Sequence, residues 1–238
     1  RKLTSLVYGL EKILLKYFSK IEEMLIPIRQ NELNKLIPSV ATSNQFAAAL
    51  GNPRKILQRI IISSIGGVVT LLISQSQVTS QFYSMWLILG VVFLLYLLWG
   101  PILEASRSNA KMKKYAFAAI FEGSIIDVYS QERVEDSQEQ ANKMGQLELI
   151  ENRRRWLVIE IGDEDGYLSK IEFPLESKHQ SISKGALVRG LVFSNNRDFS
   201  KILNISDAWL PGKRLWVGQY PFLLRPAFEE LCYLRINN

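Results

Sequence analysis

The stretch that decides the fold is residues 60–103, which reads IIISSIGGVVTLLI (60–73), then SQSQVTSQ (74–81), then FYSMWLILGVVFLLYLLWGPIL (82–103). These 44 residues contain no Asp, Glu, Lys, Arg or His. A helix needs about 20 apolar residues to cross the hydrocarbon core of a bilayer. The stretch therefore predicts two membrane crossings joined by a short polar turn.

Small residues on one side of the first crossing predict a helix–helix contact. Gly66 and Gly67 lie among Ser63, Ser64 and Thr70, and small residues let two helix backbones approach closely in a membrane. We expect this side to pack on the second crossing or on a helix of another protein, which makes both glycines candidate partner-binding residues. The second crossing is bulkier and has aromatic residues near both ends, as is common at membrane interfaces.

Basic residues flank the apolar stretch on both sides, whereas the polar turn carries no charge. The positive-inside rule then places both flanks on the cytoplasmic or stromal side. A single cysteine in the chain agrees with a reducing compartment. The residues that we assign to the membrane surface here are Arg54, Lys55, Arg59, Lys111, Lys113 and Lys114.

The N-terminal arm, residues 1–54, has a helical pattern and an excess of positive charge. Residues 1–59 hold 10 basic and 4 acidic residues, whereas residues 104–238 hold 19 of each. Apolar residues recur at helical spacing over 3–25, and Lys12, Lys16 and Lys20 lie on another side. Such a helix either lies on anionic lipid headgroups or packs on a protein partner or on the protein's own domain. We expect Pro27 to end it, and short helices to follow near residues 31–37 and 44–50.

The C-terminal part changes from helical to alternating patterns. A transmembrane hairpin (55–104) and a basic juxtamembrane linker (105–118) precede a soluble β-rich domain (119–238). Its predicted strands are residues 119–129, 155–162, 167–173, 187–194 and 201–210, with a polar loop or short exposed helix at 130–145. Strands of this number and length suit a small β-barrel of the OB or SH3-like type. The predicted fold class is a membrane α+β protein.

Catalytic and metal-binding constellations are missing from the sequence. The only histidine, His179, has no nearby cysteine or second histidine, whereas metal sites usually need several such ligands. We interpret it as a loop residue, and Cys232, in a leucine-rich tail, as packed. Because charges balance in the β-rich domain, nucleic acid is a poor partner. We predict no enzymatic activity, no cofactor and no metal.

Two short segments are candidates for contact with other molecules. Arg214, Trp216 and Tyr220 are of residue types enriched at interface hot spots, but both aromatics are equally suited to closing the core of the barrel. The run at residues 153–155 is three arginines. It fits a solvated strand start, and also fits binding to phosphate or to carboxylates of a partner.

Several motifs resemble an uncharacterised family of thylakoid membrane proteins from oxygenic phototrophs, some of which are labelled phosphate transporter permeases. These motifs are FSKIEEMLIP (18–27), LIPSV (36–40), GNPRKILQR (51–59), VRGLVFS (188–194) and DAWLPGKRLWVGQYP (207–221). The resemblance implies a thylakoid location near photosynthetic complexes. A permease is disfavoured, because transporters build a midplane site from several helices and these two crossings carry no ionisable residue.

The sequence thus favours a non-enzymatic, membrane-anchored accessory or assembly factor. Its hairpin would dock on a membrane protein complex, a photosystem or an assembly intermediate, and its β-rich domain would bind the cytoplasmic face of that complex. The alternative is a self-oligomerising membrane scaffold or channel, in which the glycine-rich crossing lines the contact between copies.

Overall fold

The structure is a computed structural model that describes residues 25–76, 78–79, 81–141, 147–162 and 168–236. Within these ranges the chain is a mixed α+β protein with six α-helices and a seven-stranded antiparallel sheet. It divides into a β-rich unit, from Arg1–Glu32, Tyr115–Tyr220 and Phe228–Asn238, and a helical unit, from Leu33–Lys114 and Pro221–Ala227. Each unit is described by itself below.

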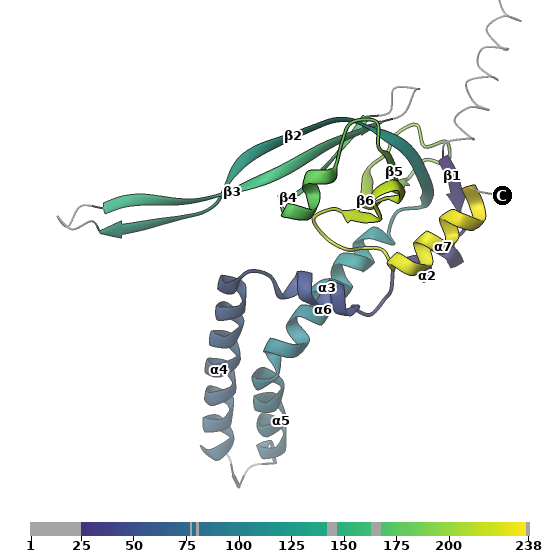
Figure 1. The fold of residues 1–238 in the computed structure, drawn as a ribbon. Helices are drawn as coiled ribbons and strands as arrows, with labels where there is room; N and C mark the ends of the chain where they lie inside the picture. The colour runs from purple at the N-terminus through teal and green to yellow at the C-terminus, as the bar shows by residue number, and fades with distance from the viewer. Residues whose placement is uncertain (1–24, 77, 80, 142–146, 163–167, 237–238) are drawn as a thin grey trace, which may run out of the picture. The chain divides into compact units, whose positions relative to one another are not determined.

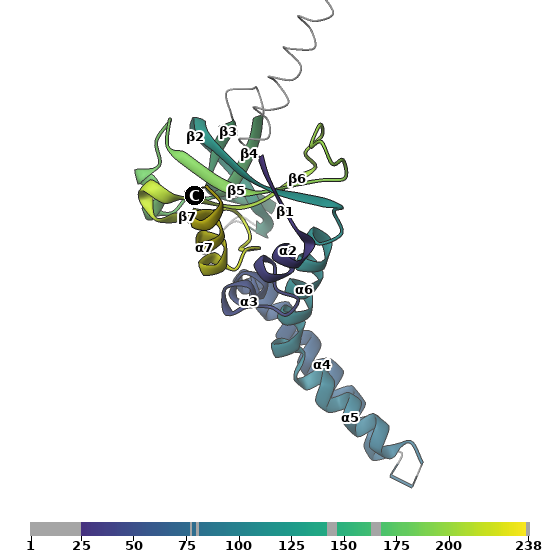
Figure 2. The same cartoon turned by 90° about the vertical axis from the view of Figure 1, so that its right-hand side faces the viewer.

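Five helices form most of the helical unit (Figures 1 and 2). They are α2 (Gln30–Leu36), which begins at the boundary of the β-rich unit, α3 (Ser43–Leu50), α4 (Pro53–Ser76), α5 (Tyr83–Leu94) and α6 (Tyr96–Met112). The two short helices expected near 31–37 and 44–50 are confirmed as α2 and α3.

Local sequence explains why α3 and α4 are separate helices. Thr42 caps the start of α3 through a capping box with Gln45. At the other end Gly51 has a φ of 80°, a left-handed value that a side chain would strain, so the chain turns there. Pro53 then begins α4, in the first turn where its missing N–H costs nothing.

The second expected crossing is not one straight helix. α5 ends at Leu94, and α6 leaves it at an angle of 72°. Only α4 is long and apolar enough to span a membrane by itself among the described helices, and α5 with α6 passes the same test only as one bent span. About 22% of the apolar window of α4 is buried, whereas the core helix of a soluble protein would be mostly buried.

A buried pair of amides holds α3 to α6. The Asn109 Nδ2 donates to Gln45 Oε1 over 2.9 Å and to the Pro38 carbonyl over 2.9 Å. The Gln45 Nε2 in turn donates to the carbonyls of Pro221 and Phe222. Both side chains are buried. Since buried amides are costly when unpaired, this network specifies how these segments pack.

The β-rich unit is built on one antiparallel sheet with strand order β4-β3-β2-β5-β6-β7, and β1 beside β2. Its strands are β1 (Leu25–Ile28), β2 (Phe117–Ala141), β3 (Leu147–Gly162), β4 (Leu168–Pro174), β5 (Leu187–Ser194), β6 (Asn204–Leu210) and β7 (Leu215–Val217). The 3₁₀ turns η1 (Ser177–Ser181) and η2 (Pro211–Lys213) and the helix α7 (Arg225–Ile236) complete it. Pro27 lies inside β1, which pairs with β2 on only one side, a place where proline is tolerated.

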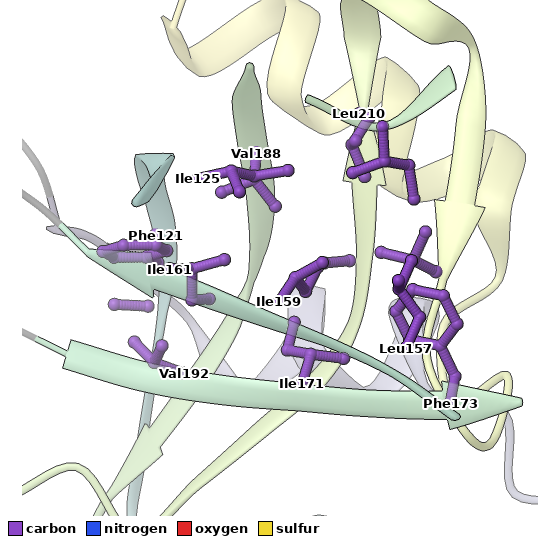
Figure 3. Packing of buried hydrophobic residues seen from close by; sticks show 14 residues of the cluster. Phe121, Ile125, Leu157, Ile159, Ile161, Ile171, Phe173, Val188, Val192 and Leu210 are labelled. Atoms are coloured by element: carbon purple, nitrogen blue, oxygen red, sulfur yellow. The ribbon is translucent and has the colours of Figure 1, made fainter. Parts of the chain in front are cut away.

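The core lies on one face of this sheet (Figure 3). Alternate residues of each strand point into it, as the two-residue repeat of a strand requires. In β3 these are Leu157, Ile159 and Ile161, which pack with Phe121 of β2 and Phe173 of β4. The strand predicted at 155–162 is found as the second half of β3.

β2 and β3 extend far beyond the core as a two-stranded ribbon, visible at the side of the sheet in Figure 1. Gln131 pairs with Trp156, and the ladder continues to Ala141 opposite Leu147. A polar loop or short helix at 130–145 is therefore wrong for residues 130–141. The strands predicted at 167–173, 187–194 and 201–210 are found as β4, β5 and β6 within three residues of their predicted ends, whereas β2 and β3 are longer than predicted. Among the described strands, pairing ends at β4 and at β7, so it defines a sheet without a closed barrel.

Candidate functional site

The glycines of the first apolar helix lie against the second. A Cβ added at Gly66 would stand 2.5 Å from the Phe93 ring, and one added at Gly67 would stand 2.5 Å from Leu94 Cδ2. From the opposite helix, a Cβ at Gly90 would meet Thr70 Oγ1 at 3.0 Å. Of the two contacts left open by the sequence, the structure contains the one within the chain.

Two hydroxyl groups lie in the seam, the contact between α4 and α5 around Gly66, Gly67 and Gly90, and each donates a hydrogen bond to a backbone carbonyl. The Ser63 hydroxyl donates to the Leu94 carbonyl of the facing helix over 2.6 Å. The Thr70 hydroxyl donates to the carbonyls of Gly66 and Gly67 in its own helix. The side of α4 that carries Ser63 and Thr70 therefore faces α5, and the apolar sides of α4 face away from it.

Apolar side chains cover the outward faces of the hairpin. On α4 the exposed ones lie opposite the contact with α5. On α5 they lie away from the face formed by Tyr83, Trp86, Gly90 and Phe93, which is buried or half-buried. The clearest cases are Ile61, Ile65, Val68, Leu72, Met85, Ile88, Val91 and Leu95. Soluble monomers rarely expose a continuous apolar surface of this extent. The hairpin is thus a surface that a lipid bilayer or a protein would cover.

Arg59, predicted to lie at the membrane surface, is instead buried. Its Nη1 donates to the Leu50 carbonyl over 3.0 Å and its Nη2 to the Ala49 carbonyl over 2.9 Å, at the end of α3. The same guanidinium forms an ion pair with Glu104 of α6. A cation at a helix C-terminus also complements the helix dipole. We therefore reassign Arg59 as a residue that joins three helices.

The other basic residues near the hairpin differ in exposure. Lys55 is exposed and pairs with Glu104 Oε1 over 3.3 Å. Lys113 is half-buried, donates to Ser39 Oγ over 3.0 Å and has its pKa lowered by burial. Arg54, Lys111 and Lys114 are exposed, as a membrane-surface role requires. Lys12, Lys16 and Lys20 lie outside the described residues.

A groove of about 590 Å³ runs along one side of α6. It is lined by Tyr96, Trp99, Gly100, Leu103, Glu104, Arg107, Ser108 and Lys111. The Trp99 indole N–H donates to the Val92 carbonyl over 2.8 Å, and the Tyr96 ring stands edge-on to Trp99 at 4.9 Å. The bend between α5 and α6 is thus braced by the two aromatics that line one end of the groove.

In the segment around η2, the arginine is exposed, whereas the aromatic side chains are partly buried. Arg214 is exposed, with a left-handed φ of 49°. The Trp216 indole N–H donates to Glu229 of α7 over 2.8 Å, and its ring packs on Phe228 and Trp209. Tyr220 is half-buried. These contacts favour the reading of Trp216 as a packed residue of the β-rich unit.

The three arginines at 153–155 have acidic partners in the ribbon. Arg153 pairs with Glu151 at 2.8 Å, Arg154 with Glu135 at 3.5 Å, and Arg155 with Glu132 at 3.7 Å. Two of these pairs cross between β3 and β2, as opposite charges on neighbouring strands commonly do. The solvated reading of this run fits these contacts best.

The two side chains most suited to catalysis are packed away. Burial holds the pKa of His179 below its ordinary value, and its Nδ1 accepts from the Glu176 backbone N–H over 3.1 Å. Burial raises the pKa of the Cys232 thiol to about 12, so almost no thiolate forms near neutral pH. Among the described residues no group of three or more His, Cys, Asp or Glu is placed to hold a metal ion.

The fold and these surfaces define a mixed α+β protein with an exposed apolar helical hairpin and a separate β-rich unit. The chain matches DUF8619, a family of unknown function, over residues 26–235 and belongs to that family. No curated protein and no solved structure matches it.

Sequence reasoning missed the residues that build this region internally. Glu104 immediately follows the charge-free stretch, and Arg59 immediately precedes it, which is the signal that could have paired them. Gln45 and Asn109 are single polar residues on otherwise packed helix faces, and nothing in their spacing brings them together. The groove depends on the bend after Leu94, where no proline or glycine marks a break.

Proposed function

We propose that this protein is a non-enzymatic, membrane-anchored accessory or assembly factor. The observation that carries the proposal is the continuous apolar outer surface of α4 and α5, whose seam is already filled. In water such a surface would drive aggregation, whereas in a bilayer it needs no further cover. In the proposed topology the hairpin crosses twice and the soluble parts on both sides of it face the cytoplasm or stroma.

The apolar segments of the hairpin are short relative to the thickness of a bilayer. At 1.5 Å per residue, the 24 residues of α4 extend about 36 Å, but its apolar part, 60–73, extends only about 21 Å. The 12 residues of α5 extend about 18 Å. The apolar part of α4 and the whole of α5 are shorter than the ~30 Å core, so the bilayer would thin locally or the flanking residues would snorkel.

The ribbon of β2 and β3 supports a docking role for the β-rich unit. Among the described residues, β5 pairs with β2 only as far as Ser124, and β4 pairs with β3 only over residues 156–162. Isolated two-stranded ribbons are of marginal stability in water. A ribbon of this kind gains stability from a binding partner. For the β-rich unit we keep the proposal of a small barrel-like domain of the OB or SH3-like type, with a gap in strand pairing between β4 and β7 among the described strands.

The partner that we propose is a photosystem or its assembly intermediate in the thylakoid membrane, on the basis of the motif resemblance. The alternative, a self-oligomerising scaffold or channel, has less support, because Gly66 and Gly67 face the chain's own second helix. Native gels of gently solubilised membranes separate the two. Comigration of the tagged chain with photosystem subunits is expected, whereas a complex that contains only this chain would favour the scaffold.

A further inference from the structure

The α6 groove combines two unpaired cations with two aromatic rings. Arg107 and Lys111 are four residues apart on one helix and therefore lie on one face. Both are exposed, and neither forms an ion pair with any residue that the structure describes. Two neighbouring cations repel each other, and an anion that binds both relieves this repulsion.

The acidic residue in the groove does not neutralise these cations. Glu104 binds Arg59 through Oε2 and Lys55 through Oε1. Its carboxylate is thus committed to α4, and the groove retains the positive charge of Arg107 and Lys111. The groove is open along one side of α6 and, at about 590 Å³, is large enough for a lipid headgroup.

The residues of α6 suit a helix that lies in the membrane interface. Tyr96 and Trp99 come first, where amphipathic rings sit at headgroup level. Exposed Leu98, Ile102 and Leu103 belong to the same half of the helix. The cations follow two to three turns later. Because α6 is bent by 72° from α5, it would lie close to the membrane plane if α5 crosses the bilayer.

We propose that this groove binds the phosphate of an anionic phospholipid headgroup, with Arg107 and Lys111 as its ligands and Trp99 and Tyr96 beside the glycerol and acyl ester region. The inference rests on the proposed membrane location. It adds a specific lipid site to an otherwise apolar anchor. Free phosphate would satisfy the same two cations, but it would leave both aromatic rings without a ligand.

The test is a titration of the full chain, purified in nonionic detergent, with short-chain phosphatidylglycerol, short-chain phosphatidylcholine and inorganic phosphate. The variant is Arg107→Gln with Lys111→Gln. The matched control is Arg197→Gln with Lys201→Gln, which removes the same charge from exposed residues of the β-rich unit. Circular dichroism verifies that each variant is folded.

We expect phosphatidylglycerol to bind more tightly than phosphatidylcholine, and the Arg107/Lys111 variant to lose roughly thirtyfold in affinity for it. The control should bind like the wild type. Equal affinity of the folded Arg107/Lys111 variant and the wild type would overturn the site. Inorganic phosphate that competes at the same concentration as the lipid would overturn the lipid assignment. Cysteine labelling of the hairpin, described below, separately reports failure of the membrane location.

Discussion

Arg59 and Glu104 form an ion pair that joins the start of α4 to α6, at the two ends of the charge-free stretch. The Arg59 side chain is 8% exposed and the Glu104 side chain 46% exposed. The arginine is therefore the desolvated partner. Its two additional bonds to the carbonyls of α3 compensate for that burial.

The first prediction concerns this junction. Arg59→Met keeps the apolar stem but leaves the Ala49 and Leu50 carbonyls without their donor, so we expect a loss of about 2–3 kcal/mol in unfolding free energy. Lys55→Met is the matched control, since an exposed pair contributes about 0–1 kcal/mol. Thermal melting of the full chain in detergent measures both. Equal small losses would show that Arg59 does not hold the helices together.

The second prediction concerns the hairpin seam. Gly67→Leu places a branched side chain where a Cβ alone would overlap Leu94, and overpacking of this kind costs about 1–3 kcal/mol. Adding Leu94→Ala to Gly67→Leu should recover part of the loss, because it vacates the same space. Leu72→Ala, on the outward face, serves as the control. If the second substitution gives no recovery, the two helices do not meet at this point.

The third prediction separates packing from binding around η2. Trp216→Ala should destabilise the protein by about 3 kcal/mol, because the ring packs on Phe228 and Trp209. Arg214→Glu should leave the melting temperature unchanged and weaken capture of the membrane complex, because this side chain is exposed. Circular dichroism and pull-down measure the two effects. Unchanged capture by folded Arg214→Glu would remove this segment from the binding surface.

The fourth prediction uses the buried thiol. The folded-state pKa of Cys232 is about 12, against an ordinary value of 9.0. The unfolded chain therefore loses this proton first as the pH rises. The stability that Cys232 contributes is complete below pH 9 and falls between about pH 9 and 12. Unfolding free energies at pH 8 and 10 should differ more in the wild type than in Cys232→Ala. An identical difference in both proteins would place the thiol in contact with solvent.

The sequence predicted the helices and strands in which buried and exposed residues alternate with a regular period. The pattern at 155–162 located β3, and the pattern at 44–50 located α3. The ribbon escaped prediction because Gln and Glu residues at 131–140 have low strand propensity. Their pairing depends instead on cross-strand partners such as Glu132 with Arg155, which sequence spacing does not reveal.

The candidate site was predictable in its apolar character and not in its internal contacts. Gly66 and Gly67 predicted a close contact between two helices, but the sequence did not show whether the second helix belongs to this chain or to another protein. Arg59 was mistaken for an interfacial residue because its partners, the carbonyls of Ala49 and Leu50, carry no sequence signature. The hydrogen bond from the Trp99 indole N–H to the Val92 carbonyl across the bend at Leu95 is likewise not predictable from the sequence.

The central claim is that α4 and α5 carry the chain across a bilayer and back. Cysteines introduced one at a time at Ser76, at the end of α4, and at exposed Ser137, in β2, test it in sealed vesicles with a membrane-impermeant thiol reagent. The native chain is the control, since Cys232 is buried and should not react. We predict that the two positions label from opposite faces, with Ser137→Cys reactive from the cytoplasmic or stromal side. Labelling of both positions from the same side would contradict the two-crossing hairpin.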